Sequence, residues 1–122
     1  MAKILVVEDT PDTREFMESM LELQGFDVVV AADGVEGLEQ AQAELPDLVI
    51  TDLSMPRLTG LEMIRKLRAT REGEKVPILA ITSHGMDKAL EAIKVGANRA
   101  LARPVQNHLL LAFVFNLLNR NA

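Results

Sequence analysis

Short runs of branched apolar residues alternate with longer stretches in which apolar residues recur at helical spacing. Runs rich in Val, Ile and Leu are typical of strands buried on both faces of a parallel sheet, and the longer stretches are typical of amphipathic helices. The pattern predicts five strands, at residues 3–8, 27–31, 47–51, 77–82 and 98–102. It predicts five helices, at residues 11–24, 35–44, 60–70, 87–95 and 106–119.

The strand–helix alternation continues along the chain without a low-complexity linker or an internal repeat. Such alternation predicts an α/β fold with a mostly parallel sheet and helices on both faces, joined by right-handed crossovers. The doubly wound (βα)5 arrangement with strand order 2-1-3-4-5 fits this number of strands. Two helix starts, Asp33 with Glu36 and Thr59 with Glu62, resemble capping boxes. We therefore expect one α/β domain over residues 1–122.

Acidic residues directly follow two of the predicted strands. Glu8 and Asp9 come after the run Ile4–Val7, and Asp52 comes after the run Leu48–Thr51. The carboxyl edge of the sheet is where open α/β folds bind ligands, and neighbouring strands lie about 4.8 Å apart. The expected strand order puts the first and third strands side by side, so these carboxylates would crowd one crevice. A hard cation or shared protons must then relieve their repulsion.

Two further residues are expected near this crevice. Thr82 closes the fourth predicted strand, which borders the third. Arg103 follows the fifth strand, about 10 Å from Asp52 by two strand spacings, a gap that its long side chain can cross. Taken alone, each has a simpler interpretation: Thr82 as a cap of the following turn, and Arg103 as a solvated or ion-paired surface charge.

The composition excludes several classes of function. The 122 residues contain no cysteine and only two histidines, which excludes disulfides, thiol nucleophiles, cysteine-based zinc sites and histidine-rich metal sites. A net charge of −5 argues against binding along a nucleic acid backbone. The apolar run Leu109–Phe115 is seven residues long, too short to cross a bilayer, and no secretory signal is apparent. We expect a cytoplasmic protein with no direct contact to nucleic acid or membrane.

The order and spacing of these residues resemble a known family. The matching motifs are Glu8-Asp9 after the first strand, Asp52-Leu-Ser-Met-Pro with Gly60, Thr82 after the fourth strand, and Gly96-Ala97 before the fifth. Together they resemble the receiver domain of two-component response regulators. The whole chain is similar to the stand-alone, CheY-like type, which has the same strand order. The resemblance implies a signalling module without an output domain, not an enzyme in the metabolic sense.

The resemblance also implies roles for individual residues. Asp52 would accept a phosphoryl group from a phosphohistidine on a sensor histidine kinase or a phosphotransfer protein. Asp9, Asp52 and the backbone carbonyl of Ser54 would hold Mg²⁺ or Mn²⁺, and Glu8 would reach the ion through water. Thr82 would hydrogen-bond the phosphoryl group, and a cation after the fifth strand would pair with it. Independently of the family, phosphoryl transfer to a carboxylate needs a divalent cation beside it.

The chain departs from the family pattern around the fifth strand. Arg103-Pro104 stands where the family has lysine and proline, and arginine is bulkier, planar and forked. A cis peptide is expected between Arg103 and Pro104. Ala100 stands where the family has a rotating aromatic residue, so any output would use backbone or helix shifts. Ser54 and His84 occupy positions that tune the lifetime of the phosphoryl group.

The last predicted helix is apolar around much of its circumference. At about 100° per residue, five residues form a stripe suited to the sheet: Leu110, Leu111, Val114, Leu117 and Leu118. Leu109, Phe113 and Phe115 widen the apolar arc to about 240°, far more than a surface helix needs to bury. Exposed apolar patches of this kind usually mark a partner surface. We expect the side formed by the fourth helix, the fifth strand and the fifth helix to bind a downstream protein or a second copy.

Two other functions fit parts of the pattern. A phosphohydrolase with an aspartate nucleophile uses a similar sheet but needs a second aspartate two residues later as general acid, where this chain has Ser54. A receiver-like docking or dimerisation module, with output independent of phosphate, would tolerate Arg103 and Ala100. The phosphoryl-accepting receiver is the favoured function, and the docking module is the alternative.

Overall fold

The five predicted strands form one parallel sheet. In the computed structural model, which describes residues 1–119, the strand order is β2-β1-β3-β4-β5, as predicted. The strands are β1 (Lys3–Val7), β2 (Asp27–Ala31), β3 (Leu48–Asp52), β4 (Ile78–Thr82) and β5 (Arg99–Ala102). Because β3 pairs with β1 on one side and β4 on the other, its carboxyl end lies between theirs.

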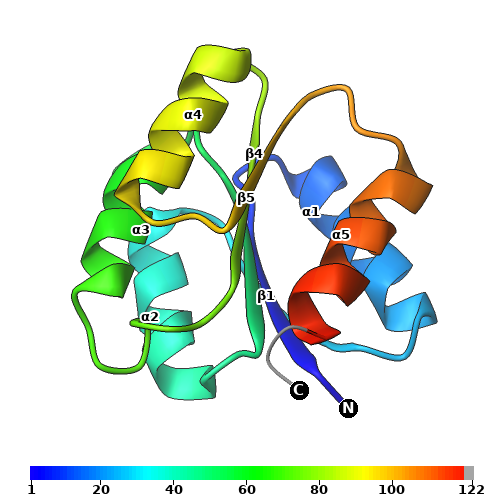
Figure 1. Ribbon diagram of the computed structural model, residues 1–122. Coiled ribbons are helices and arrows are strands. Elements are labelled where there is room, and N and C mark those ends of the chain that lie inside the picture. Colours follow the sequence, from blue (N-terminus) through cyan, green and yellow to red (C-terminus); the bar gives the residue numbers. More distant parts are fainter. Residues whose placement is uncertain (120–122) are drawn as a thin grey trace.

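Five helices cover the two faces of the sheet. They are α1 (Pro11–Leu23), α2 (Gly34–Glu44), α3 (Gly60–Arg68), α4 (Met86–Val95) and α5 (Asn107–Asn119). α1 and α5 pack on one face, and α2, α3 and α4 pack on the other (Figure 1). Every element lies within two residues of its predicted bounds. The doubly wound α/β fold is therefore confirmed.

The core consists of two apolar layers, one on each face of the sheet. Side chains alternate along a strand, so Leu5 and Val7 of β1 belong to the layer under α2, α3 and α4. Ile4 and Val6 belong to the layer under α1 and α5. Because both faces are buried at β1, β3 and β4, the middle of each of these strands is apolar. The polar residues Glu8, Asp52 and Thr82 come where β1, β3 and β4 end, at the carboxyl edge.

The two predicted capping boxes form to different extents. At α3 the box is complete: Thr59 Oγ1 accepts the Glu62 N–H at 3.2 Å, and Glu62 Oε1 accepts the Thr59 N–H at 3.2 Å. At α2 the cap is one-way, with Asp33 Oδ1 accepting the Glu36 N–H at 2.9 Å. The prediction at α2 is therefore right for the Asp33 cap alone.

Arg68, the last residue of α3, joins several segments at the amino edge of the sheet. Its guanidinium donates four hydrogen bonds, to the carbonyl oxygens of Gly96 (2.9 Å), Gly73 (2.8 Å) and Val76 (2.6 Å) and to Oδ1 of Asn98 (2.9 Å). Burial lowers the pKa of this guanidinium. Carbonyls that the connections would otherwise leave unpaired are satisfied by one side chain. The network fixes the ends of α3 and α4 against the starts of β4 and β5.

α5 buries more of its apolar arc than the helical-wheel count suggests. Its fully buried residues are Leu110, Val114 and Leu117. Phe113 is half-buried against the same core, whereas Leu109 and Phe115 are 45% and 42% exposed. The Phe115 ring lies 5.4 Å from the Phe26 ring between centroids, so it has a partner within the chain. Among residues 1–119, no helix combines the length and the apolar character that crossing a membrane requires.

Candidate functional site

Three carboxylates meet at the carboxyl edge of the sheet. Glu8 and Asp9 directly follow β1, and Asp52 is the last residue of β3. The two strands pair in register, with Val7 opposite Thr51. One carboxylate oxygen from each of the three acids lies within 4.8 Å of the others. The expected convergence of the three acids is therefore found.

Asp52 is held by the backbone that follows it. Its Oδ1 accepts the N–H groups of Leu53 at 2.7 Å and Ser54 at 3.4 Å. The N–H of Gly60, at the start of α3, donates to the Leu53 carbonyl at 3.0 Å. A Cβ atom at Gly60 would lie 2.6 Å from the Leu53 Cα and closer still to the Asp52 carbonyl oxygen. The close approach of α3 thus fixes the segment Asp52–Ser54 and requires glycine.

Glu8 is buried and paired with Arg103. Only 3% of Glu8 is exposed. Its Oε1 accepts from Arg103 Nη2 at 2.8 Å, and its Oε2 accepts the Thr10 N–H at 3.2 Å. Burial raises the pKa of the Glu8 carboxyl, and the negative charge of Asp52 raises it further, although the Thr10 N–H and Arg103 oppose the rise. Arg103 therefore forms an ion pair with Glu8. This is the simpler of the two roles expected for it from the sequence.

The raised pKa of Glu8 predicts how stability depends on pH. Because the folded protein binds the Glu8 proton more tightly than the unfolded chain, this group stabilises the fold at low pH and loses that contribution as the pH rises. We expect the free energy of unfolding of wild type, relative to Glu8→Gln, to fall as the pH rises from the ordinary glutamate value of 4.5 through the raised pKa. Urea unfolding followed by circular dichroism, without divalent cations, measures it. A difference that grows with pH over this range would contradict the prediction.

The donor set at this edge fits a hard cation. It consists of one carboxylate oxygen from each of the three acids, and Mg²⁺ prefers oxygen ligands and keeps several waters. Both oxygens of Glu8 already accept hydrogen bonds. Asp9 and Asp52, each half-buried, are therefore the acids best suited to direct contact with an ion.

Arg14 on α1 is a residue near the acids that the sequence analysis missed. Its Nη1 donates to the carbonyl oxygen of Glu8 at 2.9 Å and to that of Asp9 at 3.5 Å. The guanidinium thus holds the backbone that carries both acids and brings a positive charge close to them. A cation in the first turn of the helix that follows an acidic pair is a signal that could have identified it.

A second missed contact anchors the connection between β3 and α3. Arg57 has a positive φ of 66° and donates from Nε to Asp33 Oδ2 at 2.9 Å, with Nη2 at 2.7 Å from the same oxygen. Asp33 is also the cap of α2, and its pKa is lowered by the Glu36 N–H and by Arg57. The connection that carries Ser54 is thereby tied to the start of α2.

The remaining candidates lie on β4, β5 and the connections that follow them. Thr82 is 1% exposed, and its Oγ1 accepts the His84 N–H at 3.0 Å, which is the capping role considered above. A hydroxyl that accepts one bond still has its proton to donate. Ala100 is half-buried against the layer under α4. The Arg103–Pro104 peptide is cis, as expected.

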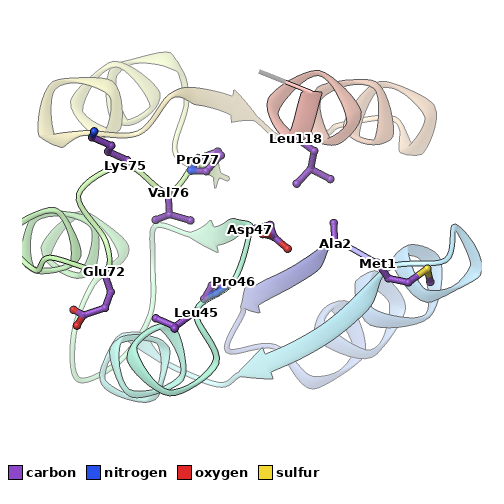
Figure 2. A pocket seen from close by; sticks show the side chains of 10 residues that line it. All are labelled: Met1, Ala2, Leu45, Pro46, Asp47, Glu72, Lys75, Val76, Pro77 and Leu118. Atoms are coloured by element: carbon purple, nitrogen blue, oxygen red, sulfur yellow. The ribbon is translucent and has the colours of Figure 1, made fainter. Parts of the chain in front are cut away.

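A larger hollow lies at the opposite edge of the sheet. It has a volume of about 590 Å³ and is lined from the N-terminus, the α2–β3 and α3–β4 connections and α5 (Figure 2). Its acid nearest the strands, Asp47, accepts the Lys3 N–H at 2.8 Å through Oδ2. The three converging carboxylates lie at the other edge, so this hollow is separate from the candidate site.

Comparison with known proteins agrees with this geometry. The family model described as "Response regulator receiver domain" matches residues 4–115. The chain belongs to the response regulator receiver family. Receiver domains of this family are modules of two-component signalling, so the resemblance noted in the sequence is confirmed.

Individual receivers show the extent of the similarity. The response regulator MprA of Mycobacterium ulcerans is 39% identical over 119 residues, which are 97% of this chain and 50% of MprA, so the chain spans about half of that relative's length. CheY4 of Vibrio cholerae is 34% identical, with a TM-score of 0.90 over 96% of this chain and 98% of that one. The receiver domain of the Pseudomonas aeruginosa sensor histidine kinase PA1611 is 30% identical, with a TM-score of 0.90 over 97% and 98% of the two chains. That structure has a magnesium ion in its active-site cleft.

Proposed function

We propose that this receiver accepts a phosphoryl group on Asp52 from a phosphohistidine of a sensor histidine kinase or phosphotransfer protein. The convergence of Asp52 with Asp9 and Glu8 at the carboxyl edge is the observation that carries the proposal. As the bond from phosphorus to the Asp52 oxygen forms, the bond to the histidine nitrogen breaks. The electron pair of the broken bond stays on the imidazole.

Each residue of the site has a part in this proposal. Asp9, Asp52 and the Ser54 carbonyl would hold Mg²⁺, or Mn²⁺ in its place. The ion would supply positive charge for the acidic crevice and the incoming phosphoryl oxygens. Thr82 would donate its hydroxyl proton to a phosphoryl oxygen, and Arg103 would pair with another. Ser54 and His84, both exposed, would set how long the phosphoryl group survives.

The output is proposed to be a change in protein binding on the side formed by α4, β5 and α5. Three exposed residues of α4, Met86, Leu90 and Ile93, are spaced i, i+4 and i+7 and share one side of the helix. On α5, Leu109 and Phe113 line a hollow of about 280 Å³ with Arg99 of β5. The α4 stripe adds to the apolar surface expected from α5. The proposal places the protein in the cytoplasm, without direct binding to nucleic acid or membrane.

A docking module that does not need phosphate is the second candidate. The exposed stripe on α4 favours it, together with Ala100 in place of the family's aromatic residue. The phosphohydrolase is disfavoured because Ser54 cannot serve as the general acid that such an enzyme needs.

Incubation with Mg²⁺ and a small acyl phosphate separates these functions. Intact-mass spectrometry reports the adduct, and amide NMR reports Mg²⁺ binding. An adduct on Asp52 that decays slowly supports the receiver. Rapid turnover of many phosphoesters supports the hydrolase, and Mg²⁺-independent partner binding without an adduct supports the docking module.

We expect polar substitutions on the α4–β5–α5 side to weaken self-association. If a second copy binds there, the double variant Leu90→Gln/Leu109→Gln should weaken the dimer by at least about tenfold, because it removes two apolar side chains from the contact. Sedimentation velocity over a range of concentrations measures it, with and without acyl phosphate. The matched control is Leu23→Gln on α1, an 85% exposed leucine away from this side. A wild type that stays monomeric under all these conditions rejects self-association.

A further inference from the structure

The Arg103–Glu8 ion pair joins two strands that are not neighbours. β5 and β1 are separated in the sheet by β4 and β3, a distance of about 14 Å by three strand spacings. The pair at 2.8 Å therefore crosses the carboxyl ends of β4 and β3. Thr82 and Asp52 are the last residues of those two strands. The guanidinium is thus held across the crevice that contains the candidate acceptor.

Glu8 is built to hold this guanidinium in one place. Its carboxylate is buried, and its second oxygen is fixed by the Thr10 N–H. Its backbone carbonyl is fixed by Arg14. A buried carboxylate with a fixed orientation is a directional acceptor, whereas the Arg103 side chain, one third exposed, is long and flexible when free. The fixed partner therefore determines where the guanidinium lies.

We propose that Glu8 is a positioning residue for Arg103, and that this pairing, more than contact with a metal ion through water, is its main role in this chain. A planar, forked cation can keep Glu8 on one nitrogen and offer its other N–H groups to a phosphoryl oxygen on Asp52. An arginine in this position needs such an orienting partner because its donors lie in one plane. The inference rests on the proposed function for the phosphoryl group, but the ion pair itself does not.

Phosphorylation rates in a set of four proteins test the inference. Wild type, Glu8→Gln, Arg103→Gln and the double variant are compared for the rate of Asp52 adduct formation with acyl phosphate. If Glu8 acts through Arg103, each single variant loses about ten- to a hundredfold, and the double variant is no slower than the slower single variant. Losses that multiply in the double variant, or a Glu8→Gln variant as fast as wild type, would overturn the inference.

Magnesium affinity distinguishes a positioning role of Glu8 from a role as a metal ligand, because the two roles predict different affinities for the double variant. Glu8→Gln removes a negative charge from the crevice and Arg103→Gln removes a positive one, while the double variant leaves the net charge unchanged. We expect the double variant to bind Mg²⁺ within about threefold of wild type, since two opposite charges are removed together. Affinity in the double variant as weak as in Glu8→Gln alone would assign Glu8 to the metal and contradict the proposal.

The experiment separates failure of this inference from failure of the proposed function. Absence of an adduct on wild type overturns the proposed function, whereas an adduct whose rate is insensitive to Glu8 overturns only the inference. Glu44→Gln is the matched control, because Glu44 also pairs with a cation, Lys3, at 3.0 Å, but at the amino edge of the sheet. This variant should form the Asp52 adduct at the wild-type rate.

Discussion

Replacing Asp52 by asparagine is expected to abolish the phosphoryl adduct and to weaken Mg²⁺ binding by at least about tenfold. An amide oxygen is a much poorer nucleophile than a carboxylate, and it removes one of the charges that attract a hard cation. The same change relieves repulsion between Asp52 and Glu8, which helps to raise the pKa of Glu8. We therefore expect Asp52→Asn to unfold at a higher urea concentration than wild type when no divalent ion is present. Intact mass, amide NMR titration and urea unfolding measure the three effects.

Asp47→Asn is the matched control for this substitution. Asp47 is exposed, sits at the amino edge of the sheet and accepts the Lys3 N–H. It should form the adduct and bind Mg²⁺ as wild type does. If Asp52→Asn still takes up a phosphoryl group at the wild-type rate, the acceptor is another residue and the proposed site is wrong.

Gly60→Ala is expected to lower the free energy of unfolding by about 3 kcal/mol, because the added methyl group overpacks a site closed by backbone atoms. The new Cβ would lie 2.6 Å from the Leu53 Cα and against the Asp52 carbonyl. Neither neighbour is the end of a flexible side chain, so α3 or the segment after β3 must shift. That shift would displace the Ser54 carbonyl, and we expect Mg²⁺ affinity to fall as well. Urea unfolding by circular dichroism and NMR titration provide the two measurements.

Gly37→Ala is the control, because it makes the same change in a buried glycine of α2. There an added Cβ would lie 2.8 Å from the Met63 sulfur and 3.1 Å from the nearer Val7 methyl group, and both are side-chain atoms where Gly60 meets backbone. Alanine also favours the helix interior by about 1 kcal/mol. We expect Gly37→Ala to change stability by less than about 1 kcal/mol. Equal losses in the two variants would show that the closeness of Gly60 to Asp52 is not what matters.

The strand order could be predicted because both faces of the three central strands, β1, β3 and β4, are buried. Continuous apolar runs such as Ile4–Val7 allow few arrangements other than a doubly wound sheet, and the acids that follow them then share one edge. The closeness of Asp9 and Asp52 could be predicted from their positions at the ends of two adjacent strands alone. This part of the site depends on backbone topology, which a hydrophobic pattern encodes well.

The partner of Arg103 could not be predicted in the same way. A long side chain at the end of β5 can reach several acceptors, and from the sequence Arg103 was expected to pair with a phosphoryl group on Asp52. Glu8, the first residue after β1, was expected only as a ligand through water. Their contact depends on rotamers and on the burial of Glu8, which no local pattern specifies.

The apolar surface was only partly predicted. Phe113 and Phe115 were expected to be part of an exposed apolar surface on α5. In the structure Phe113 is half-buried, and Phe115 packs against Phe26. The more exposed stripe is on α4, where the small buried residues Ala89 and Ala92 make the inward face easy to overlook. The larger apolar residues of this helix, Met86, Leu90 and Ile93, are on its exposed side.

One hydrogen bond of Arg68 leads us to expect that the two ends of α4 move by different amounts. Arg68 donates a hydrogen bond to the carbonyl of Gly96, directly after α4. At the other end of the helix, the N-cap residue Gly85 provides no side-chain cap. We therefore expect the last turn of α4 to be held more firmly than its first turn. Thr82 lies three residues before Gly85, so we expect a rearrangement that begins at Thr82 to displace the first turn of α4 more than the last. Met86, in the first turn, should then be displaced more than Ile93, in the last turn.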